Sequence, residues 1–243
     1  MRDFEHITEW IFDLDNTLYP RSCDLFTQID RRMTQYVMAL TELPWDAARK
    51  LQKDLYRDHG TTLNGLMHLY NIDPDDYLRA VHSIDYSPVV AHPEFISLVR
   101  ALPGRKFIFT NADSGHAETV LERLGGADIF DGMFDIRDAG YQPKPARASY
   151  EKFLATFDVA PHHAAIFDDL DKNLAVPHEL GMRTVQVIVA PETIADDEAD
   201  NWHSLPKEAR PHVHYETDDL PAFLRALHAA GFAAASPVKA KKV

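Results

Sequence analysis

The sequence predicts an α/β fold in which a doubly wound parallel sheet carries a small helical domain inserted after the first strand. The first observation is an apolar stretch at residues 10–12 that ends in acidic residues, which is typical of a buried parallel strand. The second is a run of helical patterns within residues 20–86. The third is the alternation of helices and short apolar strands after Pro93, an order that produces parallel sheets.

The inserted domain is expected to contain four short helices. In the first, apolar residues recur every three or four positions; they are Leu25, Ile29, Met33, Val37 and Leu40. Pro44 is suited to the start of the second helix, and Gly60-Thr61-Thr62 interrupts the pattern before the third. Asp73 and Pro74 have the order of an N-cap and a first helical residue, so they begin the fourth.

Helices and strands alternate in the second half of the chain. The expected helices are residues 94–102, 115–124, 146–157, 172–180 and 220–228. The expected strands are residues 106–109, 133–136, 164–167, 184–189 and 212–215. We therefore assign residues 1–19 and 87–232 to the α/β core, residues 20–86 to the helical domain and residues 233–243 to a flexible basic tail.

Composition and charge limit the classes of function. The chain has 243 residues, 45% hydrophobic and 26% charged, which suffices for one α/β domain with an insert. Its formal net charge of −13 disfavours binding to nucleic acid polymers or to anionic membranes. Cys23 is the only cysteine, so no intrachain disulfide can form and a reducing, cytoplasmic location is expected. No apolar stretch of about 18 residues and no basic-then-apolar start occurs, so neither a membrane span nor a signal peptide is expected.

Asp13 and Asp15 follow the first strand and are the leading candidates for a functional site. Residues two apart on an extended chain project to the same side, so the two carboxylates repel unless a cation lies between them. This arrangement favours a divalent-metal site at the end of the strand. The alternative is an ordinary Asp-Asn turn whose acids cap the next helix.

Further polar residues of types that bind phosphate or metal lie at or near the ends of later strands. They are Thr110 and Asn111, then Lys144 between two prolines, and then Asp168 and Asp169. In an open parallel sheet, ligands bind beyond the carboxyl ends of the strands, so these residues are expected to meet Asp13. Each also has a plain alternative: a Thr/Asn turn, a surface lysine and an acid-rich helix start.

Together these segments resemble the motifs of the haloacid-dehalogenase superfamily. Its first motif, D-x-D-x-T, is present at residues 13–17, and the threonine, the lysine and the paired acids follow in the family's order. The sequence D-N-T-L-Y, the position of the insert and the later motifs also resemble the pyrimidine 5′-nucleotidase subfamily. The resemblance implies a Rossmann-like core with a helical cap, which is formed here by residues 20–86.

The resemblance also implies a role for each residue. Asp13 attacks phosphorus and forms an aspartyl-phosphate, and Asp15 protonates the leaving oxygen and later activates water. Thr110, Asn111 and Lys144 are expected to bind the phosphoryl group.

The resemblance implies Mg²⁺ as the cofactor. The expected ligands suit this ion, because Mg²⁺ prefers oxygen atoms. The expected ligands are Asp13, the backbone carbonyl of Asp15, and Asp169, with Asp168 as a supporting or alternate ligand. Asn173 stands where many relatives have another acid, which is a departure from the family pattern.

The sequence therefore predicts a Mg²⁺-dependent phosphatase for a small phosphorylated metabolite, with pyrimidine nucleoside 5′-monophosphates favoured. The alternatives are a phosphatase for sugar or other metabolite phosphates, and a catalytically idle relative that binds phosphate or a protein partner. An idle relative is expected to lack one of the motif residues, and all are present. Dehalogenases displace a halide, which needs no proton, and they lack the second acid, so Asp15 favours phosphate chemistry.

Residues 60–65 of the helical domain are a candidate specificity loop. Two glycines permit tight turns, and Thr61, Thr62 and Asn64 carry groups that can hydrogen-bond a polar part of a substrate. We predict Thr62 and Asn64 as substrate-binding residues. The alternative is a plain loop between two helices.

Overall fold

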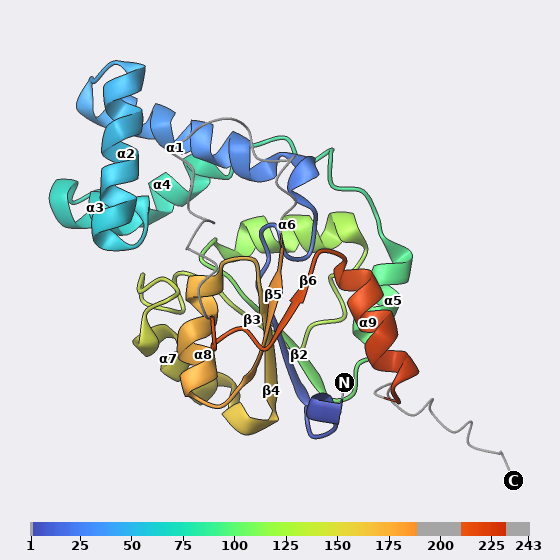
Figure 1. Ribbon diagram of the computed structural model, residues 1–243. Helices are drawn as coiled ribbons and strands as arrows, with labels where there is room; N and C mark the ends of the chain where they lie inside the picture. Colours follow the sequence, from blue (N-terminus) through green and yellow to red (C-terminus); the bar gives the residue numbers. More distant parts are fainter. Residues whose placement is uncertain (1, 189–209, 232–243) are drawn as a thin grey trace, which may run out of the picture.

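The computed structural model describes residues 2–188 and 210–231, which form a parallel sheet, flanking helices and a separate helical cap (Figure 1). The sheet has the strand order β3-β2-β1-β4-β5-β6, and every neighbouring pair is parallel. The strands are β1 (Glu9–Phe12), β2 (Arg105–Phe109), β3 (Gly132–Phe134), β4 (Ala164–Asp168), β5 (Arg183–Val187) and β6 (Tyr215–Thr217). The strand order reverses between β1 and β4, and the crevice beyond such a reversal is where open α/β sheets bind ligands.

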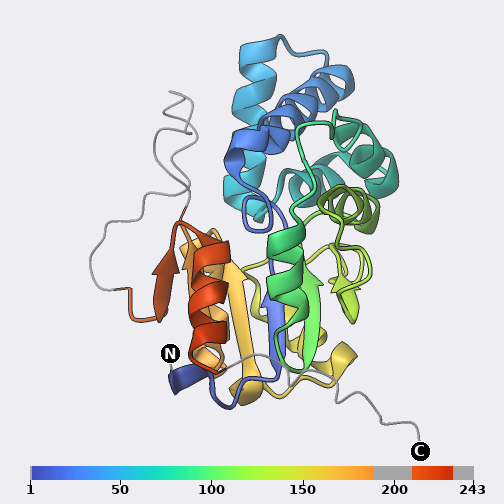
Figure 2. The ribbon, with the colours of Figure 1, turned by 90° about the vertical axis from the view of Figure 1, so that its right-hand side faces the viewer.

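Helices cover both faces of the sheet (Figures 1 and 2). They are α5 (Pro93–Arg100), α6 (Ser114–Leu124), α7 (Arg147–Phe157), α8 (Ala175–Glu179) and α9 (Leu220–Ala229). Trp10 and Phe12 belong to a hydrophobic core shared with α5, α6 and α9, whereas Ile11 between them belongs to a core shared with α7 and α8. The alternation buries β1 on both faces and confirms the doubly wound fold that the sequence predicts.

The inserted helices form a cap over the carboxyl ends of the strands (Figure 2). They are α1 (Leu25–Thr41), α2 (Trp45–His59), α3 (Thr62–Tyr70) and α4 (Pro74–Val81), and they share a hydrophobic core of their own around Leu55 and Leu66. The segments that enter and leave the cap are joined by Gln28 and Asp85. The Gln28 amide donates to the Asp85 carbonyl at 3.0 Å and accepts from the Asp85 N–H at 2.9 Å.

Local sequence explains where the cap helices begin and end. Gly60 ends α2 with a φ of +82°, a conformation that favours glycine. The Thr61 side chain accepts a hydrogen bond from the N–H of Asn64 and begins α3. The Asp73 side chain accepts from the N–H of Asp75 at the start of α4, with Pro74 as the first helical residue, as predicted.

The structure corrects several element boundaries, including those of the last strand, the third strand and the helix expected at residues 172–180. The last strand is Tyr215–Thr217 rather than residues 212–215, because the His212 carbonyl and the His214 N–H are bonded to the Thr184 hydroxyl instead. The third strand ends at Phe134, because the Asp135 carboxylate then accepts from two backbone N–H groups and turns the chain. The helix predicted at residues 172–180 begins as a 3-10 turn, Asp171–Leu174, before α8.

The predicted basic tail, residues 233–243, lies outside the described residues, as do residues 189–209 and 232 of the predicted core, which include the last residue of the expected strand 184–189. Within residues 2–188 and 210–231, no helix combines the length and the apolar character needed to cross a membrane.

Candidate active site

The polar residues at the carboxyl ends of the central strands meet at one place beneath the cap. Asp13 follows β1, Thr110 follows β2, and Asp168 and Asp169 lie at the end of β4. The Asp13 N–H donates to the Phe167 carbonyl at 2.9 Å, which extends the pairing of β1 with β4 and holds the two acidic strand ends side by side. Asp13, Thr110, Lys144 and Asp169 all line the same cavity.

Lys144 lies at the centre of this group. Its ammonium donates to Asp13 Oδ1 at 2.8 Å, to Asp168 Oδ2 at 2.7 Å and to the Phe109 carbonyl at 2.8 Å. Burial opposes the charged form, but Asp13 and Asp168 outweigh it and hold the pKa of Lys144 above its ordinary value. Lys144 is therefore a fixed positive charge that touches two of the carboxylates.

Asn111 lines the cavity, but its amide is committed to the segment that carries Lys144. Asn111 Oδ1 accepts from the Lys144 N–H at 2.8 Å, and Nδ2 donates to the Lys144 carbonyl at 3.2 Å. Asn111 therefore braces the lysine, a role that the sequence did not indicate. Thr110 is buried, and its hydroxyl oxygen accepts from the Ala112 N–H at 3.0 Å, so the hydroxyl proton can be donated to a ligand.

The carboxylates of Asp13, Asp168 and Asp169 offer oxygen atoms that lie within 4.8 Å of one another. Burial raises the pKa of Asp13 to about 7, against the opposing effect of Lys144 and with a further upward contribution from Asp168. Burial, and then Asp13, raise the pKa of Asp169 well above its ordinary value. Three buried carboxylates facing one ammonium leave negative charge that a divalent cation would neutralise.

The donor set at this place fits a cation that prefers oxygen. Asp168 accepts three protein hydrogen bonds, from Lys144, Asn173 and the Leu170 N–H, so both of its oxygen atoms are occupied. The Asp169 carboxylate accepts none within the described chain and lines the cavity, which makes it the better direct ligand. Asn173 Oδ1 is buried without a hydrogen-bond partner among the described residues, and this residue also lines the cavity. An unpaired oxygen beside the three carboxylates is what a metal shell or its bound water would use.

Asp15 occupies a different environment from Asp13. It accepts hydrogen bonds from the Tyr19 hydroxyl and from His116 Nε2, the latter at 2.8 Å. Burial favours its neutral form, but His116 and then Tyr19 outweigh burial and lower the pKa of Asp15. Its side chain is 20% exposed and lines the cavity, so the carboxyl group can reach a bound substrate.

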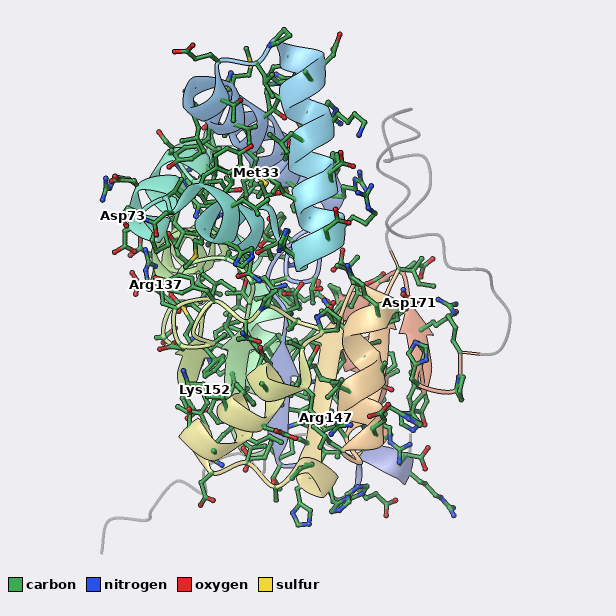
Figure 3. All side chains as sticks on the ribbon, turned by 90° about the vertical axis from the view of Figure 1, so that its left-hand side faces the viewer. Met33, Asp73, Arg137, Arg147, Lys152 and Asp171 are labelled. Atoms are coloured by element: carbon green, nitrogen blue, oxygen red, sulfur yellow. The ribbon has the colours of Figure 1, made fainter. Side chains whose placement is uncertain are left out.

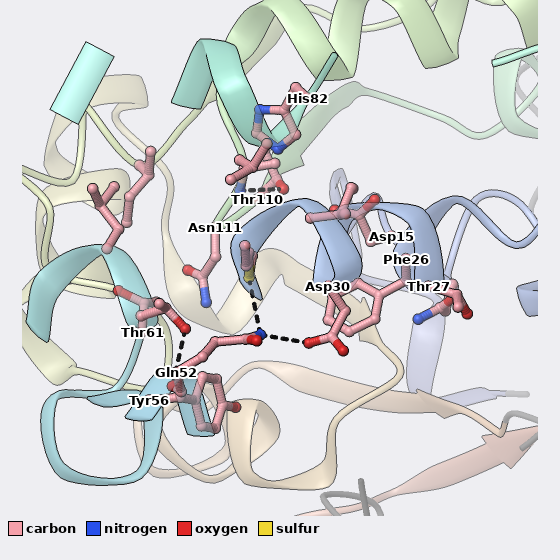
Figure 4. Close-up of a pocket in the computed structure, with 18 of the residues that line it drawn as sticks. Asp15, Phe26, Thr27, Asp30, Gln52, Tyr56, Thr61, His82, Thr110 and Asn111 are labelled. Carbon is pink, nitrogen blue, oxygen red and sulfur yellow. Dashed lines mark hydrogen bonds between the residues drawn. The ribbon is translucent and has the colours of Figure 1, made fainter. Parts of the chain in front are cut away.

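The cavity has a volume of about 430 Å³ and runs from the strand ends into the cap (Figure 4). Of the residues labelled in the close-up, Asp15, Thr110 and Asn111 come from the core, and Asp30, Gln52 and Tyr56 come from the cap helices α1 and α2. Thr62, predicted to bind substrate, lines the cavity, and its hydroxyl donates to the Gln52 carbonyl at 3.3 Å.

Asn64 is not among the residues that line the cavity, and this corrects the prediction for the cap loop. Its side-chain amide donates to the His59 carbonyl at 2.9 Å. This bond satisfies a backbone group that the end of α2 leaves free. Asn64 therefore supports the junction of α2 and α3 rather than a substrate.

A family model for haloacid dehalogenase-like hydrolases matches residues 10–181. The chain belongs to this family. The match covers β1, the cap and the strands up to β4, so it includes all the polar strand ends described above.

Two curated relatives of this hydrolase have names from phosphate chemistry. Phosphate metabolism protein 8 of Saccharomyces cerevisiae is 29% identical over 136 residues, which are 51% of this chain and 42% of that protein. Enolase-phosphatase E1 of Shewanella woodyi is 28% identical over 102 residues, which are 40% of this chain and 44% of that protein. The matches span less than half the length of each relative.

Solved structures of low sequence identity share the fold of this hydrolase. The HAD-hydrolase YfnB from Bacillus subtilis has a TM-score of 0.55 and 16% identity, covering 91% of this chain and 98% of that chain. The L-2-haloacid dehalogenase PA0810 has a TM-score of 0.54 and 15% identity, covering 91% of this chain and 99% of that chain. Both support the assignment of the fold.

The groups that surround Asp15 in this hydrolase were not predicted from the sequence. His116 is fully enclosed on α6, its Nδ1 lies 3.0 Å from the Tyr86 hydroxyl, and its ring stacks on His82 with centroids 4.6 Å apart. Tyr19 is four residues from Asp15, and its place in the sequence D-N-T-L-Y was a usable signal. His82 and His116 lie far from Asp15 in sequence, and only the fold brings them to it.

Proposed function

We propose that this hydrolase is a Mg²⁺-dependent phosphatase that cleaves small phosphomonoesters and prefers pyrimidine nucleoside 5′-monophosphates. The observation that carries the proposal is the Asp15 carboxyl group, open to the cavity beside Asp13 and held by His116 and Tyr19. A phosphate ester releases an alkoxide that needs a proton, whereas a halide does not. The names of the two curated relatives also support phosphate chemistry.

In the proposed reaction, an oxygen of Asp13 attacks phosphorus, a bond forms between them, and the bond from phosphorus to the leaving oxygen breaks. Asp15 is ionised in the free site and accepts a hydrogen bond from His116, whose pKa Asp15 raises against the effect of burial. The His116 proton passes to Asp15, and Asp15 gives it to the leaving oxygen, which departs as an alcohol. Water then attacks the aspartyl-phosphate, Asp15 takes back a proton, and the release of phosphate restores both carboxyl groups. Thr110 donates a hydrogen bond to a phosphoryl oxygen in both steps. The Lys144 ammonium, whose three N–H groups are bonded to Asp13, Asp168 and the Phe109 carbonyl, attracts the phosphoryl group by its positive charge.

Mg²⁺ would be held by Asp13, Asp169 and the backbone carbonyl of Asp15, with Asp168 and Asn173 behind them. When bound, it neutralises the repulsion between Asp13 and the phosphate and polarises the phosphoryl group. Lys144 alone is a single positive charge against three carboxylates, which supports the need for a second cation.

Phosphate release tests the proposal, measured with Mg²⁺ on nucleoside monophosphates, sugar phosphates and p-nitrophenyl phosphate. We expect wild-type turnover with the highest kcat/KM on uridine or cytidine 5′-monophosphate, and none with Asp13→Asn, which keeps the shape but is a poor nucleophile. Turnover by Asp13→Asn within a few-fold of wild type would overturn the mechanism. If activity is highest on a sugar phosphate, the proposed phosphatase activity stands, but the proposed preference for pyrimidine nucleotides is wrong.

A small phosphorylated metabolite is the partner that this proposal requires. The net charge of −13 supports the absence of a nucleic acid polymer or an anionic membrane as a partner. The single cysteine supports a cytoplasmic location.

A further inference from the structure

The cap supplies the wall of the cavity that faces the strand ends. Several of its buried polar groups are already bonded to one another. Gln52 Nε2 donates to Asp30 at 2.6 Å (Figure 4). Gln52 Oε1 accepts from the Thr34 hydroxyl. Arg49 and Lys53 donate to the same Asp30 at 2.7 and 2.9 Å. These groups hold each other in place before any ligand arrives.

Tyr77 differs from them. It lies on α4, lines the cavity and is only 1% exposed, yet its hydroxyl group makes no hydrogen bond with any described residue. Burial raises the pKa of Tyr77, an effect that the nearby Thr62 hydroxyl only partly offsets, so Tyr77 is a neutral donor at physiological pH. Thr62 gives its own proton to the Gln52 carbonyl. A buried hydroxyl without a partner is unfavourable, which indicates that a ligand supplies the partner.

The lining of the cavity also includes aromatic rings. Phe26 and Trp45, near the starts of α1 and α2, both line it and are 38% and 36% exposed. Met33 and Leu63 add apolar surface to the lining. Partly exposed aromatic rings in the lining of a cavity favour a flat, unsaturated ring, which a sugar phosphate lacks and a nucleobase provides.

We propose that Tyr77, Phe26 and Trp45 form a nucleobase subsite, in which the Tyr77 hydroxyl donates a hydrogen bond to a carbonyl oxygen or ring nitrogen of the base. This inference rests on the proposed function, because it places the phosphate of a nucleoside 5′-monophosphate at Asp13 and Lys144. It assigns specificity to a residue outside the loop at residues 60–65.

Tyr77→Phe tests the subsite, because it removes one oxygen atom and leaves the ring. Tyr36→Phe is the matched control, since the Tyr36 ring packs edge-on against Tyr77 at 5.0 Å between centroids but does not line the cavity. The substrates are uridine 5′-monophosphate and ribose 5-phosphate, which is the same molecule without the base. We expect Tyr77→Phe to lower kcat/KM on the nucleotide about three- to tenfold and to leave ribose 5-phosphate unchanged.

The unfolding temperature shows whether the Tyr77 hydroxyl supports the fold or a ligand. Tyr77→Phe should unfold at the wild-type temperature or above it, since the lost hydroxyl has no partner in the free protein. Equal losses on both substrates, or an unchanged nucleotide kcat/KM, would overturn the subsite.

If the wild-type protein releases no phosphate at all, the binding of the same two molecules to wild type and to Tyr77→Phe is measured by calorimetry instead. Weaker nucleotide binding in Tyr77→Phe, with ribose 5-phosphate unaffected, would uphold the subsite although the proposed function had failed. Equal binding of the nucleotide to both proteins, or no binding to either, would overturn it.

Discussion

Removal of the proposed Mg²⁺ should destabilise the protein more at high pH than at low pH. The pKa of Asp13, raised to about 7, lies above the 3.8 of an ordinary aspartate, so the metal-free fold binds a proton that the unfolded chain releases. The free energy of unfolding of the metal-free protein should therefore fall as the pH rises from about 4 to about 7. Mg²⁺ reverses this loss, because it takes the place of the proton on Asp13.

The expected magnitude follows from that pKa. At about pH 5 only about 1% of Asp13 is ionised, so Mg²⁺ binding must displace a proton and becomes about 100-fold weaker than at about pH 8. Once Mg²⁺ is well above its Kd at both pH values, its stabilisation should differ between them by about 2.7 kcal/mol. For a chain of this size, that difference corresponds to roughly 5–10 °C in the shift of Tm caused by Mg²⁺.

Thermal unfolding followed by circular dichroism, with Mg²⁺ or with EDTA at each pH, measures this difference. Asp13→Asn removes one of the titrating groups and should make the Mg²⁺ shift depend less on pH, while Asp169, whose pKa is also raised, retains part of the dependence. Asp128→Asn, at an exposed ion pair with Arg100, should behave as wild type. If Mg²⁺ raises the wild-type Tm equally at both pH values, Asp13 does not exchange a proton for the metal and the electrostatic account of the site fails.

Three further variants test other parts of the site. Asp15→Asn should lower kcat on nucleotides by about 10²–10⁴ in steady-state assays, and less on p-nitrophenyl phosphate, whose leaving group needs no proton; equal losses on both would argue against proton transfer. Lys144→Met leaves buried carboxylates uncompensated and should lower the free energy of unfolding by about 3–5 kcal/mol in urea titrations with EDTA, and an unchanged midpoint would contradict this. Asn64→Ala should cost about 1 kcal/mol of stability with kcat/KM on uridine 5′-monophosphate unchanged, and a selective loss of nucleotide turnover would return this residue to the substrate site.

The fold was predictable from the sequence because short apolar strands recur along it and polar residues follow them. Residues 10–12 alternate between two cores, and the later strands repeat this short apolar pattern, so their order along the chain was readable. Asp13, Thr110, Lys144 and Asp169 were predicted together because parallel strands end at the same edge of a sheet.

Other features depend on contacts that sequence spacing does not encode. His116 reaches Asp15 across 101 positions of the chain, and Tyr77 becomes a cavity residue only when α4 packs against its neighbours. Asn64 looked like a ligand because its side chain is polar, but the nearby His59 carbonyl is its partner. The start of β6 was predicted too early, because the His212 carbonyl and the His214 N–H are hydrogen-bonded to the Thr184 hydroxyl rather than to a neighbouring strand.

The separate hydrophobic core of the cap has an evolutionary consequence. Mutations around Leu55 and Leu66 change the packing of the cap helices. Mutations in the cores that flank the sheet instead change the positions of the strand ends that carry the acids. New substrates can therefore be acquired by drift in one set of residues while selection preserves the reaction in another. Ile136 is an exception, because it follows β3 yet packs in the core of the cap and lines the cavity. A mutation of Ile136 would therefore affect the substrate preference and the reaction together.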